Sequence, residues 1–378
     1  MLQLRSLIVY IFICVQHLML PFVVQATTYS YNIHANTNST KSNNAVVFPD
    51  LDEILNPITG EIIGDVNFLL DWAVLGFPKC GTTSLLKYLN TGTSSIDLEH
   101  ERCDAGYSSS RYDRNMTTLI RSLYHDLYVP NNGNVTIARG LKCPKGLVSR
   151  SVLNFDRYFP NTQIIIGVRH PITWFQSFYN YRIRDGYNIP YPHELMGRCT
   201  GRSEGVCADN ARFHYLLARL GKTNMTSAEE MQLLFRNANA WMFDFGYVRT
   251  KNQVFLYEVD QLGDVNASRA ELFRRDLARF IHVPEDELGP MIHSKPGRKN
   301  LKPFQQEYVD KYSINICDEE HDELRSVLML HAVDASRWIR KYFLESPDVM
   351  VSSKYYLDEI LAKWEIDKCY AEESTATA

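Results

Sequence analysis

Short, almost purely apolar runs, each followed by a helical stretch, constrain the fold of this 378-residue chain more than any other feature. They lie at residues 68–76 (FLLDWAVLG), 162–168 (TQIIIGV) and 253–257 (QVFLY). Runs of this kind are typical of strands buried on both faces, as happens when crossover helices connect parallel strands. The pattern therefore predicts an α/β fold, with a central parallel sheet flanked by helices in three layers.

Helices are expected after each run, at residues 81–89, 171–184 and 268–282, and a longer one at about 318–343. The long helix places Leu324, Leu328, Ala335 and Trp338 on one stripe, which indicates core packing. The chain is 45% hydrophobic and 22% charged, as in globular domains. Its 44 acidic and 40 basic side chains give a formal charge of −4, so no nucleic-acid partner is expected.

The N-terminus has the pattern of a targeting segment. Arg5 precedes an apolar run at 7–24, so residues 1–26 are interpreted either as a signal peptide that is cleaved after Ala26 or as a membrane anchor. Both interpretations place the protein in the secretory pathway, either anchored as a type II membrane protein or secreted. Residues 27–66 are expected to form a flexible stem, because 27–45 are rich in Asn, Ser and Thr. The folded domain is expected at 67–370.

A glycine-bounded loop joins the first predicted strand to the first predicted helix. Loop amides and a helix N-terminus together form a cradle for an anion. The spacing from Gly76 to Gly81 is that of a nucleotide P-loop, but Thr82 stands where the P-loop lysine should follow. The lysine of this loop is Lys79 instead. A P-loop kinase or nucleoside triphosphatase is therefore disfavoured, because its lysine binds the β and γ phosphates.

Residues 78–85 (PKCGTTSL) resemble a loop of the sulfotransferase family, Pro-Lys-x-Gly-Thr-Thr, that cradles the 5′-phosphosulfate of 3′-phosphoadenosine 5′-phosphosulfate (PAPS). The resemblance assigns binding of this co-substrate to Pro78, Lys79, Cys80, Gly81, Thr82, Thr83 and Ser84. Residues 165–179 (IIGVRHPITWFQSFY) are similar to the family's 3′-phosphate segment, with Arg169 at a strand end and Ser177 eight residues later. An arginine fork at this edge of a sheet can bind a phosphate, and a serine hydroxyl can donate to it.

The resemblance also implies catalytic groups. Lys79 is expected to neutralise the leaving phosphate, and Glu101, in the stretch 96–102 (IDLEHER), to accept the acceptor proton, with Glu99 in reserve. Lys142, in 141–144 (LKCP), resembles the lysine of the family's Glu-Lys-(Ser/Thr)-Pro turn, which points at the sulfate. Arg298, in 294–299 (SKPGRK), resembles part of a basic loop that closes over the nucleotide.

Two of these stretches depart from the family pattern. The aromatic pair that usually follows the base is replaced by residues 102–104 (RCD), and the glutamate that usually precedes the lysine of the Lys142 turn is absent. The resemblance implies a PAPS-dependent sulfotransferase of the secretory, carbohydrate-acting branch in the Golgi lumen, with a hydroxyl or, as second choice, an amine of a glycan as acceptor. A protein-tyrosine sulfotransferase and a secreted glycan-binding protein without turnover remain as alternatives. No metal is expected, because neither HExxH nor paired CxxC occurs.

The chain has eight cysteines, and in an oxidising lumen cysteines are expected to form disulfide bonds. Cys14 lies in the targeting segment and Cys80 in the loop, which leaves six to pair. Fifteen connectivities of these six are possible, and the sequence does not choose among them. Cys199–Cys207, which encloses a short loop, is favoured; Cys103–Cys143, which would tie the two catalytic stretches together, is a hypothesis, and Cys317–Cys369 then remains. Glycosylation sequons start at Asn38, Asn115, Asn134, Asn224 and Asn266, in agreement with a lumenal location.

Overall fold

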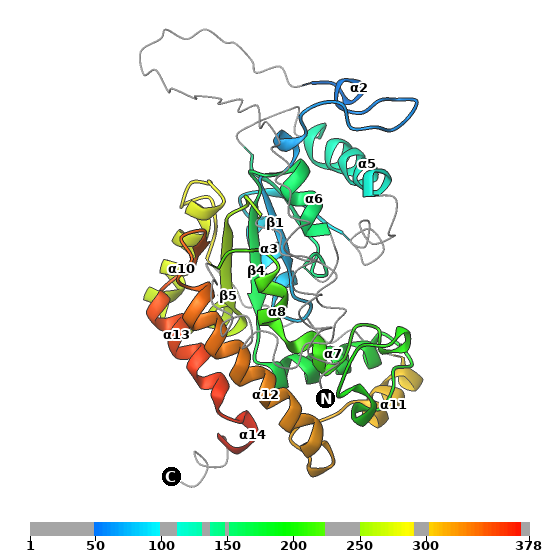
Figure 1. Ribbon diagram of the computed structural model, residues 1–378, viewed down its shortest axis with the longest axis vertical. Helices are drawn as coiled ribbons and strands as arrows, with labels where there is room; N and C mark the ends of the chain where they lie inside the picture. Colours follow the sequence, from blue (N-terminus) through cyan, green and yellow to red (C-terminus); the bar gives the residue numbers. More distant parts are fainter. Residues whose placement is uncertain are drawn as a thin grey trace, which may run out of the picture. The chain divides into compact units, whose positions relative to one another are not determined.

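Six strands form one sheet in the part of the chain that the structure describes, and each neighbouring pair is parallel (Figure 1). The structure is a computed structural model that describes residues 49–98, 112–130, 137–147, 151–223, 250–290 and 302–371. The strand order is β2-β3-β1-β4-β5-β6. The strands are β1 (Trp72–Gly76), β2 (Ser94–Asp97), β3 (Arg139–Lys142), β4 (Gln163–Val168), β5 (Val254–Glu258) and β6 (Val349–Met350).

Both faces of the sheet are buried. Alternate residues of a strand point to opposite faces, so the two sets of side chains enter different apolar clusters. In β1, Trp72 and Val74 belong to one apolar cluster, whereas Ala73 and Leu75 belong to another. The first cluster includes residues of α3 (Thr82–Leu89) and α10 (Ala267–Phe280), and the second includes residues of α5 (Tyr112–Leu123), α7 (Pro171–Arg184), α12 (Asp322–Trp338) and α13 (Lys354–Ala362). Helices cover each face, so the predicted three-layer α/β fold with a central parallel sheet is confirmed.

Local sequence signals fix the ends of several helices. Pro171 occupies the first turn of α7, where its missing N–H has no cost. The Asn266 side chain caps α10 by accepting a hydrogen bond from the Arg269 amide at 3.0 Å. The other described α-helices are α2 (Leu51–Ile54), α6 (Ser151–Tyr158), α8 (Phe213–Ala218), α11 (Pro303–Tyr312) and α14 (Lys368–Ala371).

The strands and helices predicted from apolar runs are present, with small shifts at their ends. Strands β4 and β5 begin one residue later than predicted, and α7 spans its predicted residues. The first strand is shorter than the predicted 68–76, because a 3-10 helix at Asn67–Leu69 precedes it. Asp65 initiates that turn by accepting a hydrogen bond from the Asn67 amide at 2.9 Å. The predicted long helix ends as α12 at Trp338 and continues as a π-helical turn.

Strands β2, β3 and β6 are absent from the sequence prediction. The edge strands β2 and β6 are short and largely half-buried, so neither carries a continuous apolar run. Strand β3 is buried, but its sequence RGLK contains two cations. Asp71 compensates the charge of Arg139. It accepts hydrogen bonds from the Arg139 amide at 2.7 Å and from Arg139 Nε at 3.3 Å. Tertiary partners, rather than local apolar periodicity, therefore permit this strand.

Folded structure extends to the N-terminal side of Asn67, where the stem was expected to end. Ile54, Leu55 and Val66 are buried in the larger apolar cluster. The described residues belong to one compact unit, Phe48–Ala378. None of the helices in the described ranges is long and apolar enough to cross a bilayer. The predicted targeting segment at 1–26 lies outside those ranges.

The connections after β1 and β4 leave the sheet in opposite directions. From β1 the chain passes through α3 to β2, towards one edge, whereas from β4 it passes through α7 to β5, towards the other. Because β1 and β4 are neighbours, their carboxyl ends lie side by side at the point where the two connections diverge. Ligands of open α/β sheets bind at such a switch point, which makes this edge the place to look for a site.

The disulfide bonds agree with the predicted pairing where the structure describes both partners. Cys199 is bonded to Cys207 and Cys317 to Cys369, as predicted. Cys143 is also disulfide-bonded, but its expected partner, Cys103, lies outside the described residues.

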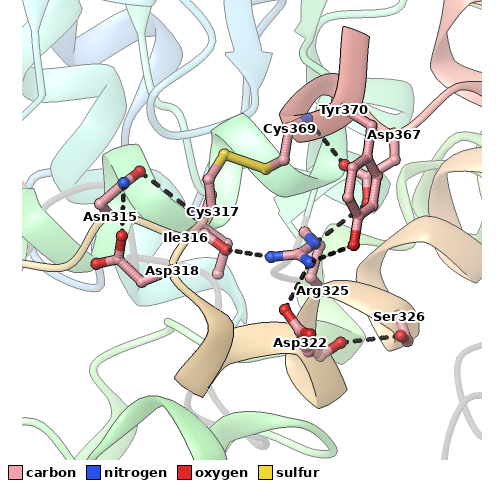
Figure 2. A network of polar contacts seen from close by, with 10 residues as sticks. All are labelled: Asn315, Ile316, Cys317, Asp318, Asp322, Arg325, Ser326, Asp367, Cys369 and Tyr370. Carbon is pink, nitrogen blue, oxygen red and sulfur yellow. Dashed lines mark hydrogen bonds and ion pairs between the residues drawn. A yellow bond between two sulfur atoms is a disulfide. The ribbon is translucent and has the colours of Figure 1, made fainter. Parts of the chain in front are cut away.

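A polar network surrounds one of these bonds (Figure 2). Beside the Cys317–Cys369 bond, Arg325 donates to the Ile316 carbonyl at 3.2 Å, to Asp367 at 3.2 Å and to the Tyr370 hydroxyl at 3.3 Å. This network and the disulfide hold the end of the described chain against the start of α12.

We expect Gly140→Ala to destabilise the fold by about 1–3 kcal/mol, the usual range for overpacking a core. A Cβ atom at Gly140 would lie 2.0 Å from Cε2 of the buried Trp72 ring. Urea unfolding followed by tryptophan fluorescence measures the change in the free energy of unfolding. Gly197→Ala is the matched control, because a Cβ there meets no atom within 4 Å. Equal midpoints for the two variants would contradict the packing of β3 against β1.

Candidate active site at the carboxyl edge of the sheet

The β1–α3 loop (residues 76–81) has a backbone that few residue types adopt without strain. Lys79 has φ of 66° and Gly81 has φ of 78°, both in the left-handed region. A Cβ atom at Gly81 would lie 2.5 Å from Leu262 Cδ1, so both the backbone and the packing require glycine. Lys79 has no such freedom, and strained backbone of this kind concentrates at functional sites.

Two aromatic side chains donate hydrogen bonds from the protein interior to carbonyl groups of this loop. Trp174 Nε1 of α7 donates to the Pro78 carbonyl at 2.8 Å, and the Tyr257 hydroxyl of β5 donates to the Cys80 carbonyl at 2.9 Å. Tyr257 reaches that carbonyl because β4 has a glycine beside it: a Cβ at Gly167 would lie 2.4 Å from the tyrosine ring. The loop conformation therefore depends on β4, β5 and α7 as well as on its own sequence.

With these carbonyls turned inward, amides of the loop are turned outward. In a trans peptide the N–H points to the side opposite the preceding carbonyl, so the amides of Lys79 and Gly81 face away from the two donors. Helix α3 begins at Thr82, and its first-turn amides have no carbonyl one turn earlier within the helix. These amides and the positive end of the helix dipole form a cradle suited to an anion.

The side chain of Lys79 lies among other cations. Its Nζ is 4.1 Å from the centroid of the Tyr181 ring. Burial, followed by the charges of Arg184 and Arg169, lowers the pKa of Lys79 to about 8. Because like charges gathered at one place repel, a bound anion would stabilise this cluster.

Arg169 follows β4 directly and connects it to the β1–α3 loop. Its Nη1 donates to the Lys79 carbonyl at 3.3 Å, and its Nε donates to Thr173 Oγ1 at 3.2 Å. Both acceptors are uncharged, and the side chain is half-buried. The structure thus brings two of the predicted site residues, Arg169 and Lys79, into contact, and these two bonds leave the guanidinium charge uncompensated.

A polar stripe on α7 runs along the same side of the site. Thr173, Ser177, Tyr181 and Arg184 are spaced by four, four and three residues, which places them on one side of the helix. Thr173 contacts Arg169, and Tyr181 contacts the lysine of the loop, so the stripe faces the loop. Ser177 lies between these contacts on the stripe and is half-buried.

Lys142, the last residue of β3, reaches the first turn of α3. Its Nζ donates to Thr83 Oγ1 at 3.2 Å and to Asp97 Oδ2 at 2.6 Å. The predicted cations Lys142, Lys79 and Arg169 therefore follow or end β3, β1 and β4, which are adjacent in the sheet. Strand order, rather than proximity in the sequence, places them at one edge.

A neutral carboxyl group lies under this edge. Glu258 ends β5 beside Val168 of β4 and is fully buried. Its Oε2 accepts a hydrogen bond from the Asp260 amide at 2.6 Å, while Oε1 has no hydrogen-bond partner among the described atoms. Burial, followed by the charge of Asp260, raises the pKa of Glu258 to about 8. The group is therefore protonated at pH 7 and adds no negative charge that would repel an anion.

Several predicted site residues lie outside the described ranges. These are the expected base Glu101, its neighbours Glu99 and His100, and the basic-loop residue Arg298. Conversely, Tyr181 and Arg184 are absent from the predicted site, although their spacing from Ser177 on a predicted helix places them on the same side.

The described residues contain no group of three His, Cys, Asp or Glu side chains placed to hold a metal ion. Cys80, in the loop, forms no disulfide and is fully buried. Burial raises the pKa of its thiol far above the usual range, so Cys80 packs as a neutral thiol. The cations and amides are therefore the groups through which this loop can act on a ligand.

Comparison of the sequence with protein-family profiles and with curated proteins finds no match. Among solved structures, the chain is similar to the sulfotransferase from Alicyclobacillus acidocaldarius. The two share 15% sequence identity with a TM-score of 0.41, and the match covers 71% of this chain and 95% of that chain.

The Lys79 amine should titrate with a pKa of about 8, and Arg184→Gln should raise that value by removing a nearby positive charge. The pH dependence of acylation at this lysine, followed by mass spectrometry of its peptide, measures both. Arg337→Gln is the control, because that arginine is exposed on α12. A Lys79 that titrates like an ordinary exposed lysine in all three proteins would contradict the described cluster.

Proposed function

We propose that this chain is a PAPS-dependent sulfotransferase of the secretory pathway that moves a sulfuryl group to a hydroxyl, or in second place an amine, of a glycan. The observation that carries the proposal is the position of Lys142, Lys79 and Arg169 at the ends of adjacent strands around an amide-lined loop. That arrangement suits a small ligand with several anionic groups. Thr82, at the position of the P-loop lysine, argues against transfer from a nucleoside triphosphate.

PAPS fits the residues at this edge because it carries anions at two separate places. The β1–α3 loop and the first turn of α3 would hold the 5′-phosphosulfate, with Thr82, Thr83 and Ser84 supplying amides and hydroxyls. Arg169 and Ser177, on the α7 side of the loop, would hold the 3′-phosphate. Support for this division comes from the uncharged acceptors of Arg169, which leave its charge available. In the proposal Arg298 completes the nucleotide site.

The bound donor supplies a sulfuryl group on a good leaving phosphate. In the proposed reaction Glu101 removes the proton from the acceptor hydroxyl while the hydroxyl oxygen forms a bond to sulfur. The bond from sulfur to the bridging oxygen breaks, and the electron pair leaves with the phosphate of 3′,5′-ADP. Lys79 and Lys142 neutralise the charge that develops on the departing phosphate and on the sulfuryl oxygens.

The path of the chain before Glu101 supports its part in this proposal. Asp97, which ends β2, accepts a hydrogen bond from Lys142, and the Leu98 amide donates to the Lys142 carbonyl at 3.1 Å. The segment that leads to Glu101 thus leaves the sheet beside a proposed catalytic lysine. Glu99 is the reserve base.

A lumenal location fits two observations on the described domain. The Cys199–Cys207 and Cys317–Cys369 bonds need an oxidising compartment to persist. Asn266, in an N-glycosylation sequon, is exposed, and its cap of α10 uses Oδ1 and leaves Nδ2 for a glycan.

We expect the purified protein to transfer label from radiolabelled PAPS to a desulfated glycan. Lys79→Ala should lower the rate by about 100-fold or more, as loss of a transition-state donor does, and Glu101→Gln by a similar factor. Arg169→Ala should mainly weaken donor binding, by about 10-fold or more. Lys87→Ala, an exposed lysine of α3, is the matched control.

The acceptor panel decides between the proposal and its alternatives. Label on tyrosine peptides alone would indicate a protein-tyrosine sulfotransferase. Donor binding with no label on any acceptor would indicate a binding protein. Full activity in Glu101→Gln would move the base to Glu99 or His100.

Affinity for 3′,5′-ADP should fall as the pH rises through about 8, because the pKa of free Lys79 is lowered to that value and only the protonated amine attracts the anion. In Lys79→Arg the fall should be smaller, since arginine remains charged and Glu258, whose pKa is also raised to about 8, still becomes negative in this range. Calorimetric titration across this range measures the effect. Identical pH profiles for the two proteins would show that Lys79 does not contact the ligand.

A further inference from the structure

A polar cavity of about 770 Å³ lies at the amino-terminal edge of the sheet, the edge opposite the β1–α3 loop. Its walls include Ala138, Asp71, Gln163 and Gln253, which precede or begin the adjacent strands β3, β1, β4 and β5. A strand rises about 3.3 Å per residue, so a five-residue strand separates the cavity from the loop by about 15 Å. The cavity is therefore distinct from the proposed transfer site, and its volume suits a small ligand.

Two buried acceptor atoms at this cavity have no partner among the described atoms. Gln163 is only 9% exposed, and its Nε2 lies 3.2 Å from Nε2 of His282, while its Oε1 is unpaired. Asn67 donates its backbone and side-chain amides to Asp65 at 2.9 Å and 2.8 Å, and its buried Oδ1 is likewise unpaired. Buried polar atoms without a partner destabilise a fold, so these two call for a donor from a ligand.

The charges around the cavity disfavour an anion. Asp65 and Asp71 line it, against one cation, Lys251. Asp71 is neutralised from outside the lining by Arg139, at 3.3 Å. What remains is a nearly neutral wall with unpaired acceptors, which sulfate, having no proton to donate at neutral pH, could not satisfy.

We propose that this cavity binds one or two residues of a neutral saccharide. Sugar hydroxyls donate and accept hydrogen bonds, so they can pair with the Gln163 amide and with Asn67 Oδ1. Phe68, also in the lining and half-buried, offers apolar surface to the C–H face of a sugar ring. The site needs no nucleotide, so the proposal stands independently of sulfuryl transfer.

Saturation-transfer NMR and calorimetry with chitobiose and N-acetyllactosamine test this site on the purified full chain. We expect both neutral disaccharides, or one of them, to bind, and Gln163→Leu to weaken binding at least tenfold. Gln306→Leu, an exposed glutamine on α11, is the matched control and should bind normally. Lys79→Ala and saturating 3′,5′-ADP should leave saccharide binding unchanged, which separates this cavity from the transfer site.

Ala138→Phe is a second variant that fills the cavity without touching its amides, and it should also abolish binding. A saccharide-induced rise in the thermal unfolding midpoint of the unmutated chain, absent in each folded cavity variant, would support the site. Binding that survives both cavity variants, or that is displaced by 3′,5′-ADP, would overturn it. Binding of glucuronate or inorganic sulfate in place of the neutral disaccharides would also overturn the proposal. So would the absence of any saccharide binding at millimolar concentration.

Discussion

Two hydrogen bonds, from Trp174 to the Pro78 carbonyl and from Tyr257 to the Cys80 carbonyl, carry the geometry of the whole carboxyl edge. Each contributes about 1 kcal/mol, which is modest, but their direction matters more than their strength. By turning carbonyls inward they turn amides outward, and the donors come from α7 and β5. An isolated strand–loop–helix segment would therefore not reproduce the cradle, which exists only when the parallel sheet is assembled.

The same assembly gathers like charges that the chain keeps far apart in sequence. Lys142, Lys79 and Arg169 end up together because β3, β1 and β4 are neighbours. The lowered pKa of Lys79 reports the repulsion and burial that result. Asp97 offsets Lys142 through an ion pair at 2.6 Å, and Asp185 partly offsets Lys79, whereas burial keeps Glu258 protonated at pH 7. Lys79, Arg169 and Arg184 still gather positive charge at this edge, although the chain as a whole has a formal charge of −4.

The sequence predicts those parts of the fold and site whose signals are local. Strand β4, the start of α7 at Pro171 and the position of Arg169 follow from an apolar run, a helix-start residue and the order of elements. Strand β3 escapes prediction because its charged residues are compensated by Asp71 and Asp97 from elsewhere in the chain. The amino-edge cavity is not predicted either, because its walls come together only when the starts of four strands meet.

The Cys317–Cys369 bond joins residues 52 positions apart, and α12, β6 and α13 lie between them. In the loop-entropy account, a cross-link of that span stabilises a protein by about 4 kcal/mol, against a total of about 5–15 kcal/mol for a typical domain. A large share of the folding free energy is then supplied by an oxidation reaction. Chains made in a reducing cytosol would unfold more readily even with an unchanged sequence, so the compartment of synthesis is a determinant of whether this protein folds.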